Sequence, residues 1–159
     1  MNNIKNNTVS EPLFVKNQIT IHAPVSMVWD ALVNPEQTKK YMFGCETVSD
    51  WGVGSSLDWK GTYEGQEMVF VKGKILALEI NRYLAYTTID PHSNIDDVSE
   101  NYLTVTYELE ESDGDTLLKV TQGDYNRVEE GERRYQEAFN GGEGWNPILI
   151  EIKQVVEAD

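Results

Sequence analysis

The chain contains few residues that could form disulfide bonds or bind metals. Its 159 residues include one cysteine, Cys45, and two histidines, His22 and His92. A single cysteine cannot form an internal disulfide bond, which favours a reducing compartment. Neither histidine has another histidine or a cysteine at ligand spacing, so no metal site is expected. Because no phosphate loop, nucleophile elbow or dinucleotide fingerprint occurs, we expect no cofactor and no catalytic residues.

Positive charge is also scarce. Thirteen lysines and arginines stand against 27 aspartates and glutamates, and the formal net charge is −14. This charge repels phosphate backbones, so nucleic acid is not expected as a partner. The simplest interpretation of the acidic surplus is solubility, and the alternatives are a cation site or a basic protein surface as partner.

Long apolar runs are missing as well. No segment approaches the ~20 apolar residues of a transmembrane helix, and the first residues lack the apolar core of a signal peptide. We therefore expect a cytoplasmic protein without a transmembrane segment. Residues 1–12 are polar and rich in asparagine, which predicts a disordered tail. Residues 13–159 are then expected to form one domain.

The spacing of apolar residues changes along the chain. It alternates over residues 14–21 as in a strand. It then repeats at helical spacing from Val25 to Leu32, which predicts a helix of about ten residues with Pro24 in its first turn. Asn34 and Pro35 are typical of a helix cap and first turn, and they predict a second short helix. Alternation then returns over residues 46–125, which predicts six to seven strands joined by short turns. Such a run is typical of an antiparallel meander.

The chain ends in an amphipathic helix that begins near Trp145. Its apolar residues share one stripe at helical spacing: Trp145, Ile148, Leu149, Ile152, Val155 and Val156. A sheet must bury its apolar face, and only this helix is long enough to lie across it. The sequence therefore predicts an α+β fold, in which a curved antiparallel sheet wraps round the C-terminal helix. Residues 130–139 predict a further short helix.

Three stretches of the sequence resemble one known family. They are IHAPVSMVWDALVNPEQTKKYM, VKGKILALEINRYLAYT and GWNPILIEIKQVVE. In this order they resemble the opening helices, a strand pair and the closing helix of homologues of the activator of the heat-shock-protein-90 ATPase. That group is part of the helix-grip superfamily, with START lipid-transfer domains, birch-pollen-allergen-like proteins and polyketide cyclases. The resemblance covers about residues 14–158 and implies a helix-grip fold with two short helices after the first strand. The shared residues are structural, so function is not carried over with the fold.

Aromatic side chains supply the candidate site, because a curved sheet round one helix leaves space at one end of that helix. Strand parity predicts which residues face this space, although a bulge would reverse the face of any one strand. The predicted ligand cavity is lined by Trp59, Tyr63, Met68, Phe70, Leu84, Tyr86, Thr88, Tyr107, Gln122, Trp145 and Leu149. Gln122 is a polar amide on an otherwise apolar face. Its hydrogen-bond partner is expected to be either a tyrosine hydroxyl or a polar group of the ligand.

Three functions follow from these expectations, in order of preference. The first is binding of a small hydrophobic or amphipathic molecule, such as a lipid, a polyketide or an aromatic metabolite, without catalysis. The second is a protein-interaction module of the chaperone ATPase activator type. The third is an enzyme of the cyclase or hydratase type, as in other branches of the superfamily. An enzyme would need an acid or base in the cavity, for which a tyrosine or Glu143 is the candidate.

Overall fold

The sheet of this protein is antiparallel throughout. The computed structural model describes residues 11–158, so the tail predicted over residues 1–12 lies almost wholly outside the described residues. Within the described range, seven strands pair in the order β1-β7-β6-β5-β4-β3-β2. The strands are β1 (Val15–Ile21), β2 (Glu46–Ser49), β3 (Ser56–Tyr63), β4 (Gln66–Glu79), β5 (Tyr83–Thr88), β6 (Leu103–Ser112) and β7 (Asp115–Gly123). The predicted run of six to seven strands is confirmed.

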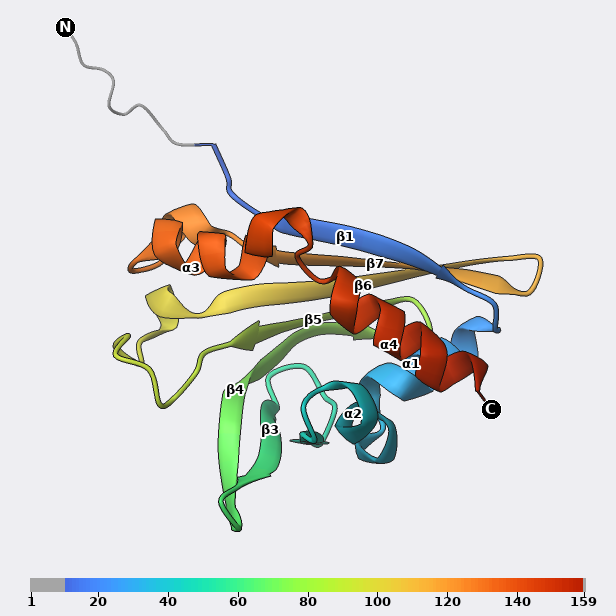
Figure 1. The fold of residues 1–159 in the computed structure, drawn as a ribbon, viewed down its shortest axis with the longest axis horizontal. Coiled ribbons are helices and arrows are strands. Elements are labelled where there is room, and N and C mark those ends of the chain that lie inside the picture. Colours follow the sequence, from blue (N-terminus) through green and yellow to red (C-terminus); the bar gives the residue numbers. More distant parts are fainter. Residues whose placement is uncertain (1–10, 159) are drawn as a thin grey trace, which may run out of the picture.

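The helices gather on one face of this sheet (Figure 1). They are α1 (Val25–Val33), α2 (Pro35–Tyr41), α3 (Gly131–Phe139) and α4 (Asn146–Glu157), with single 3-10 turns η2 (Ser99–Asn101), η3 (Tyr125–Arg127) and η4 (Asn140–Gly142). Helix α4 crosses the sheet, and the β3–β4 end of the sheet curls round toward α2. This arrangement confirms the predicted α+β helix-grip fold.

The apolar stripe of α4 fixes it on the sheet. Leu149 and Ile152 are fully buried, and Val156 is nearly so. Each fully buried aliphatic side chain of this size contributes about 1.5–3 kcal/mol relative to an exposed one. Helix α2 is capped by Asn34, as the sequence predicts. The side chain of Asn34 accepts a hydrogen bond from the backbone N–H of Glu36 at 2.9 Å.

Strand β4 contains two breaks in its pairing. Trp59 pairs with Val71 and Lys60 pairs with Val69, so Phe70 has no partner on β3. A second register shift lies in the β4–β5 pairing between Ile75 and Ala77. Bulges bend a strand and increase its twist. Because of these bends, β4 can pair with β5 in the flat part of the sheet and with β3 in its curled end.

No helix within residues 11–158 is long and apolar enough to cross a membrane.

Candidate functional site

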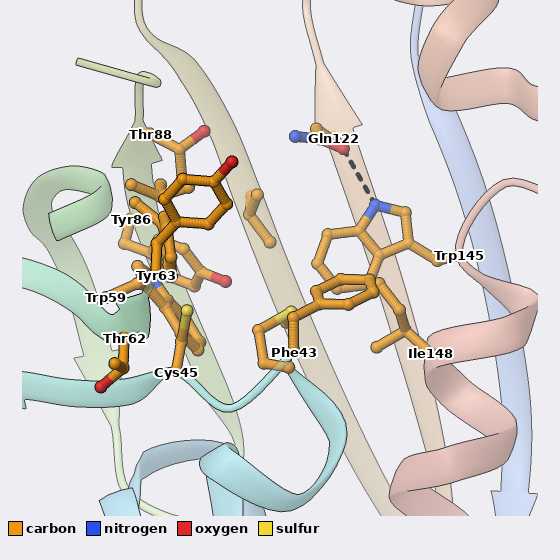
Figure 2. Close-up of a pocket in the computed structure, with 14 residues that line it drawn as sticks. Phe43, Cys45, Trp59, Thr62, Tyr63, Tyr86, Thr88, Gln122, Trp145 and Ile148 are labelled. Carbon is orange, nitrogen blue, oxygen red and sulfur yellow. Dashed lines mark hydrogen bonds between the residues drawn. The ribbon is translucent and has the colours of Figure 1, made fainter. Parts of the chain in front are cut away.

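An apolar cavity of about 510 Å³ lies between the sheet, the start of α4 and the loop from α2 to β2 (Figure 2). The residues that line it are Met42, Phe43, Cys45, Trp59, Thr62, Tyr63, Phe70, Val71, Tyr86, Thr88, Val105, Gln122, Trp145 and Ile148. None of these side chains is charged. A cavity of this size is far larger than the voids of a close-packed interior and falls in the range of small-molecule sites.

One row of the sheet forms a wall of the cavity. Tyr86 on β5 pairs with Val105 on β6, and Val105 pairs with Gln122 on β7. Antiparallel partners project to the same face of the sheet, so all three side chains point to the helix side. This row lies near the end of β5 and β7, where the sheet curls and α4 begins. The space left at that end is the cavity.

The structure brings seven of the eleven predicted site residues into the cavity lining. They are Trp59, Tyr63, Phe70, Tyr86, Thr88, Gln122 and Trp145. Figure 2 labels six of them and shows their side chains converging from β3, β5, β7 and the start of α4.

Four predicted site residues lie outside the lining. Leu84 and Tyr107 face each other across β5 and β6, two residues along from Tyr86 and Val105. Two residues of strand span about 7 Å, which places this pair one row deeper in the core. Leu149 is also fully buried in the core, and Met68 lies half-buried near the β3–β4 hairpin. Strand parity identified the correct face but not how far the cavity extends along it.

The lining also includes residues that the sequence did not indicate. Met42, Phe43 and Cys45 come from the loop before β2, where no periodic pattern exists. Phe43 is 84% exposed although it lines the cavity, so its ring stands at the rim. Tyr63 is 58% exposed and stands at the rim from the β3–β4 hairpin. Two aromatic side chains from separate turns therefore border the opening.

The side-chain oxygen of Gln122 has a partner within the protein that the sequence did not indicate. The Trp145 indole Nε1 donates a hydrogen bond to Gln122 Oε1 at 2.9 Å. The backbone N–H of Trp145 also donates to the side-chain oxygen of Asn17 on β1 at 2.9 Å. These two bonds hold the residue before α4 against the edge of the sheet, and they fix the position of the indole in the cavity wall.

A series of aromatic rings joins both sides of the cavity through the core. Trp59, Tyr86, Tyr107 and Trp145 follow one another with centroid separations of 6.1, 6.0 and 6.0 Å. Pairs at such distances contribute about 0.5–1.5 kcal/mol each beyond their buried area. These ring contacts make this wall of the cavity rigid.

The buried tyrosines are neutral at physiological pH. Burial raises the pKa of Tyr86 well above its ordinary value, and raises the pKa of Tyr107 to about 12. The Tyr86 hydroxyl donates to the Tyr107 hydroxyl at 3.4 Å. Burial also raises the pKa of the Cys45 thiol, which therefore stays protonated. These groups form a neutral wall and carry no base with a pKa near 7.

The candidate acid Glu143 lies on the exposed surface before α4. Its carboxylate accepts a hydrogen bond from the Asn140 amide at 3.3 Å, and it does not line the cavity. Over the described part of the chain, no group of three or more histidine, cysteine, aspartate or glutamate residues could hold a metal ion.

Residues 22–157 match the family described as Activator of Hsp90 ATPase homolog 1-like protein. No curated protein matches the chain at a significant level. Among solved structures, a protein from Cytophaga hutchinsonii is 35% identical to this chain. The match covers 94% of this chain and 97% of that one, with a TM-score of 0.71.

Two more distant structures are described as Aha1 or as an HSP90 activator. The Aha1 dimer from Colwellia psychrerythraea is 16% identical over 91% of this chain and 96% of that one, with a TM-score of 0.65. An HSP90 activator from Plasmodium falciparum is 16% identical over 92% and 96%, with a TM-score of 0.64. At this level of identity the likeness concerns the fold alone.

Proposed function

The chain belongs to the family of Activator of Hsp90 ATPase homolog 1-like proteins, and within that family we propose that it binds a small hydrophobic or amphipathic molecule without transforming it. The molecule would sit between the curled sheet and the start of α4. A lipid, a polyketide or an aromatic metabolite has the required chemistry.

The cavity is the observation that supports this proposal most directly. It has about 510 Å³ of space, aromatic and aliphatic walls, and no charged side chain among its lining residues. Water in such a cavity finds few hydrogen-bond partners, so an apolar molecule that displaces it gains free energy. Burial of ~200–300 Å² of apolar ligand surface contributes about 5–8 kcal/mol before the cost of association. Affinities in the micromolar range are therefore expected.

The helix α4 offers a matched pair of variants to test this proposal. Ile148 lines the cavity, whereas Ile150 on the same helix is 48% exposed and lies outside it. Ile148→Trp should fill part of the cavity, and Ile150→Trp makes the same chemical change on the opposite side. Binding of 2-ethylnaphthalene, measured by isothermal titration calorimetry, should weaken at least tenfold in the first variant and less than twofold in the second.

Two results would count against the proposal. One is that the unaltered protein does not bind the probe. The other is that both variants, folded as judged by circular dichroism, bind it equally well, because the probe would then occupy a different place.

A second candidate function is interaction with a chaperone. The family description and the net charge of −14 favour it, because an acidic domain suits a basic surface on a partner. The test is the ATPase rate of a purified Hsp90-type chaperone with increasing amounts of this protein. A rate that rises and saturates, and whose rise diminishes with added salt, would support the interaction. A constant rate would leave the cavity as the functional site.

A further inference from the structure

Gln122 presents hydrogen-bond donors to the cavity, and Trp145 determines this orientation. The two ends of a glutamine amide differ in chemistry but hardly in shape, so their assignment depends on the neighbouring groups. The indole nitrogen of Trp145 carries a hydrogen and can only donate. Its 2.9 Å contact must therefore be made with the amide oxygen of Gln122. The amide nitrogen is then on the other side.

That other side is the cavity. Figure 2 shows the nitrogen of Gln122 directed away from Trp145, toward Thr88 and Tyr63 across the space. Gln122 and Thr88 both line the cavity, and the strand neighbour of Gln122 on the wall is apolar Val105. Among residues 11–158, no hydrogen bond from the Gln122 amide nitrogen is found. Its two N–H groups can therefore be satisfied by an acceptor within the cavity.

We propose that Gln122 is a specificity-determining residue, whose amide nitrogen donates a hydrogen bond to an uncharged carbonyl oxygen of the bound ligand. This assignment rests on the proposed function, since it names the polar group of the molecule that the cavity holds. Ketones, esters and amides with an apolar body have the matching chemistry. Trp145 acts as a positioning residue, because it holds the amide in the orientation that presents the donors.

The acceptor is uncharged for electrostatic reasons. A carboxylate would lose its hydration on entering the cavity, and no lysine, arginine or histidine lines the walls to compensate. The net charge of −14 also makes the approach of an anion unfavourable. A neutral carbonyl loses much less hydration, and one or two amide N–H groups suffice to replace it.

The experiment compares three probes of similar shape on three proteins. The probes are 2-acetylnaphthalene, which has a carbonyl group, 2-ethylnaphthalene, which has none, and 2-naphthoate, which is an anion. The variant Gln122→Glu keeps an acceptor for Trp145 and replaces the donating nitrogen with an oxygen. Gln18→Glu is its control, because Gln18 is exposed on β1 and the substitution adds the same charge outside the cavity. Dissociation constants are measured by calorimetry at pH 8.

The expected result is selective. Gln122→Glu should weaken binding of 2-acetylnaphthalene about tenfold, because one hydrogen bond is lost and the new carboxylate oxygen faces the carbonyl oxygen of the probe. Binding of 2-ethylnaphthalene should weaken by a smaller factor, because this probe only desolvates the new carboxylate and has no hydrogen bond to lose. Gln18→Glu should leave both constants unchanged. The unaltered protein should bind 2-naphthoate more weakly than the ketone.

A second measurement on the unaltered protein does not depend on the folding of a variant. The side-chain amide signals of Gln122 in a nitrogen–proton correlation spectrum are identified by their loss in Gln122→Glu. These proton signals should move downfield with 2-acetylnaphthalene, and should move little with 2-ethylnaphthalene.

The possible failures can be told apart. If both neutral probes bind and Gln122→Glu weakens them equally, the carbonyl assignment is wrong while the binding function stands. If 2-naphthoate binds more tightly than the ketone, the assignment of an uncharged ligand is wrong. If none of the probes binds, the proposed function fails and the role of Gln122 fails with it.

Discussion

The substitution Gly61→Ala should narrow the cavity without unfolding the protein. Gly61 lies on β3, and its missing side chain leaves room for the ring of Phe70. A Cβ atom at Gly61 would lie 2.6 and 3.0 Å from two ring carbons of Phe70, and 3.2 Å from the sulfur of Cys45. Carbon atoms in favourable contact are ~3.5–4.0 Å apart, so the ring must move by about 1 Å. It can move into the cavity, since Phe70 is one of the lining residues.

The magnitude of this effect follows from the geometry. Overpacking costs about 1–3 kcal/mol. Replacing glycine by alanine in a strand stabilises the fold by about 0.5–1 kcal/mol, so the net loss of folding free energy is expected to be about 0–2.5 kcal/mol. If the shifted ring of Phe70 removes space for one or two methylene groups, the ligand loses about 0.8 kcal/mol for each. The affinity should then fall about four- to fifteenfold.

The assay is a calorimetric titration with 2-ethylnaphthalene, together with thermal unfolding. Gly52→Ala is the control, because its added Cβ would meet only the Ser55 hydroxyl, at 3.4 Å, outside the cavity lining. Gly61→Ala should bind more weakly than this control. If a folded Gly61→Ala protein binds the probe within twofold of Gly52→Ala, the placement of the ligand against Phe70 is refuted.

Three further predictions concern the fold. Asn34→Ala removes the cap of α2 and should lower the free energy of unfolding, measured by urea titration, by about 1 kcal/mol. An unchanged free energy would show that the cap contributes nothing. Gly73→Ala should prevent folding or lower the melting temperature severely, because its Cβ would overlap the backbone carbonyl of Thr87; a native melting temperature would contradict this packing. The pKa of the Glu157 carboxylate is lowered, chiefly by its hydrogen bond with Lys153. A carboxyl group whose pKa is lowered by folding stabilises the protein at pH values above its pKa in the unfolded chain, and this stabilisation is lost as the pH falls. Glu157→Gln should therefore flatten the decline in melting temperature between about pH 5 and pH 3. An unchanged decline would exclude this contribution.

The fold could be predicted because its elements follow regular patterns. The helical stripe that contains Leu149 and Ile152 is continuous in the sequence, and both residues are fully buried where α4 meets the sheet. Asn34 and Pro35 at the start of α2 are likewise a local signal. Such patterns depend only on neighbours in the chain, so they can be recognised before the tertiary structure is known.

The site was only partly predictable, because its limits depend on tertiary geometry. The bulge at Phe70 permits both Phe70 and Val71 to line the cavity, which simple alternation forbids. Phe43 and Cys45 lie in a loop without periodicity. How far the cavity extends along β5 and β6 depends on the place at which the sheet curls. No local pattern records that place.

The orientation of Gln122 is also a tertiary property. Gln122 and Trp145 are 23 residues apart and meet only because α4 begins beside the end of β7. The sequence showed a polar residue on an apolar face, which indicated that a partner was needed. It did not identify the indole of Trp145 as that partner.

Native mass spectrometry of protein purified without detergent tests the central claim most directly. The purified protein is incubated with an organic extract of cells, and Ile148→Trp and Ile150→Trp are treated in the same way. The account predicts a discrete added mass in the unaltered protein and in Ile150→Trp, lost on denaturation and reduced or absent in Ile148→Trp. Bare masses for all three proteins, or equal retention by both variants, would contradict a ligand site in the cavity.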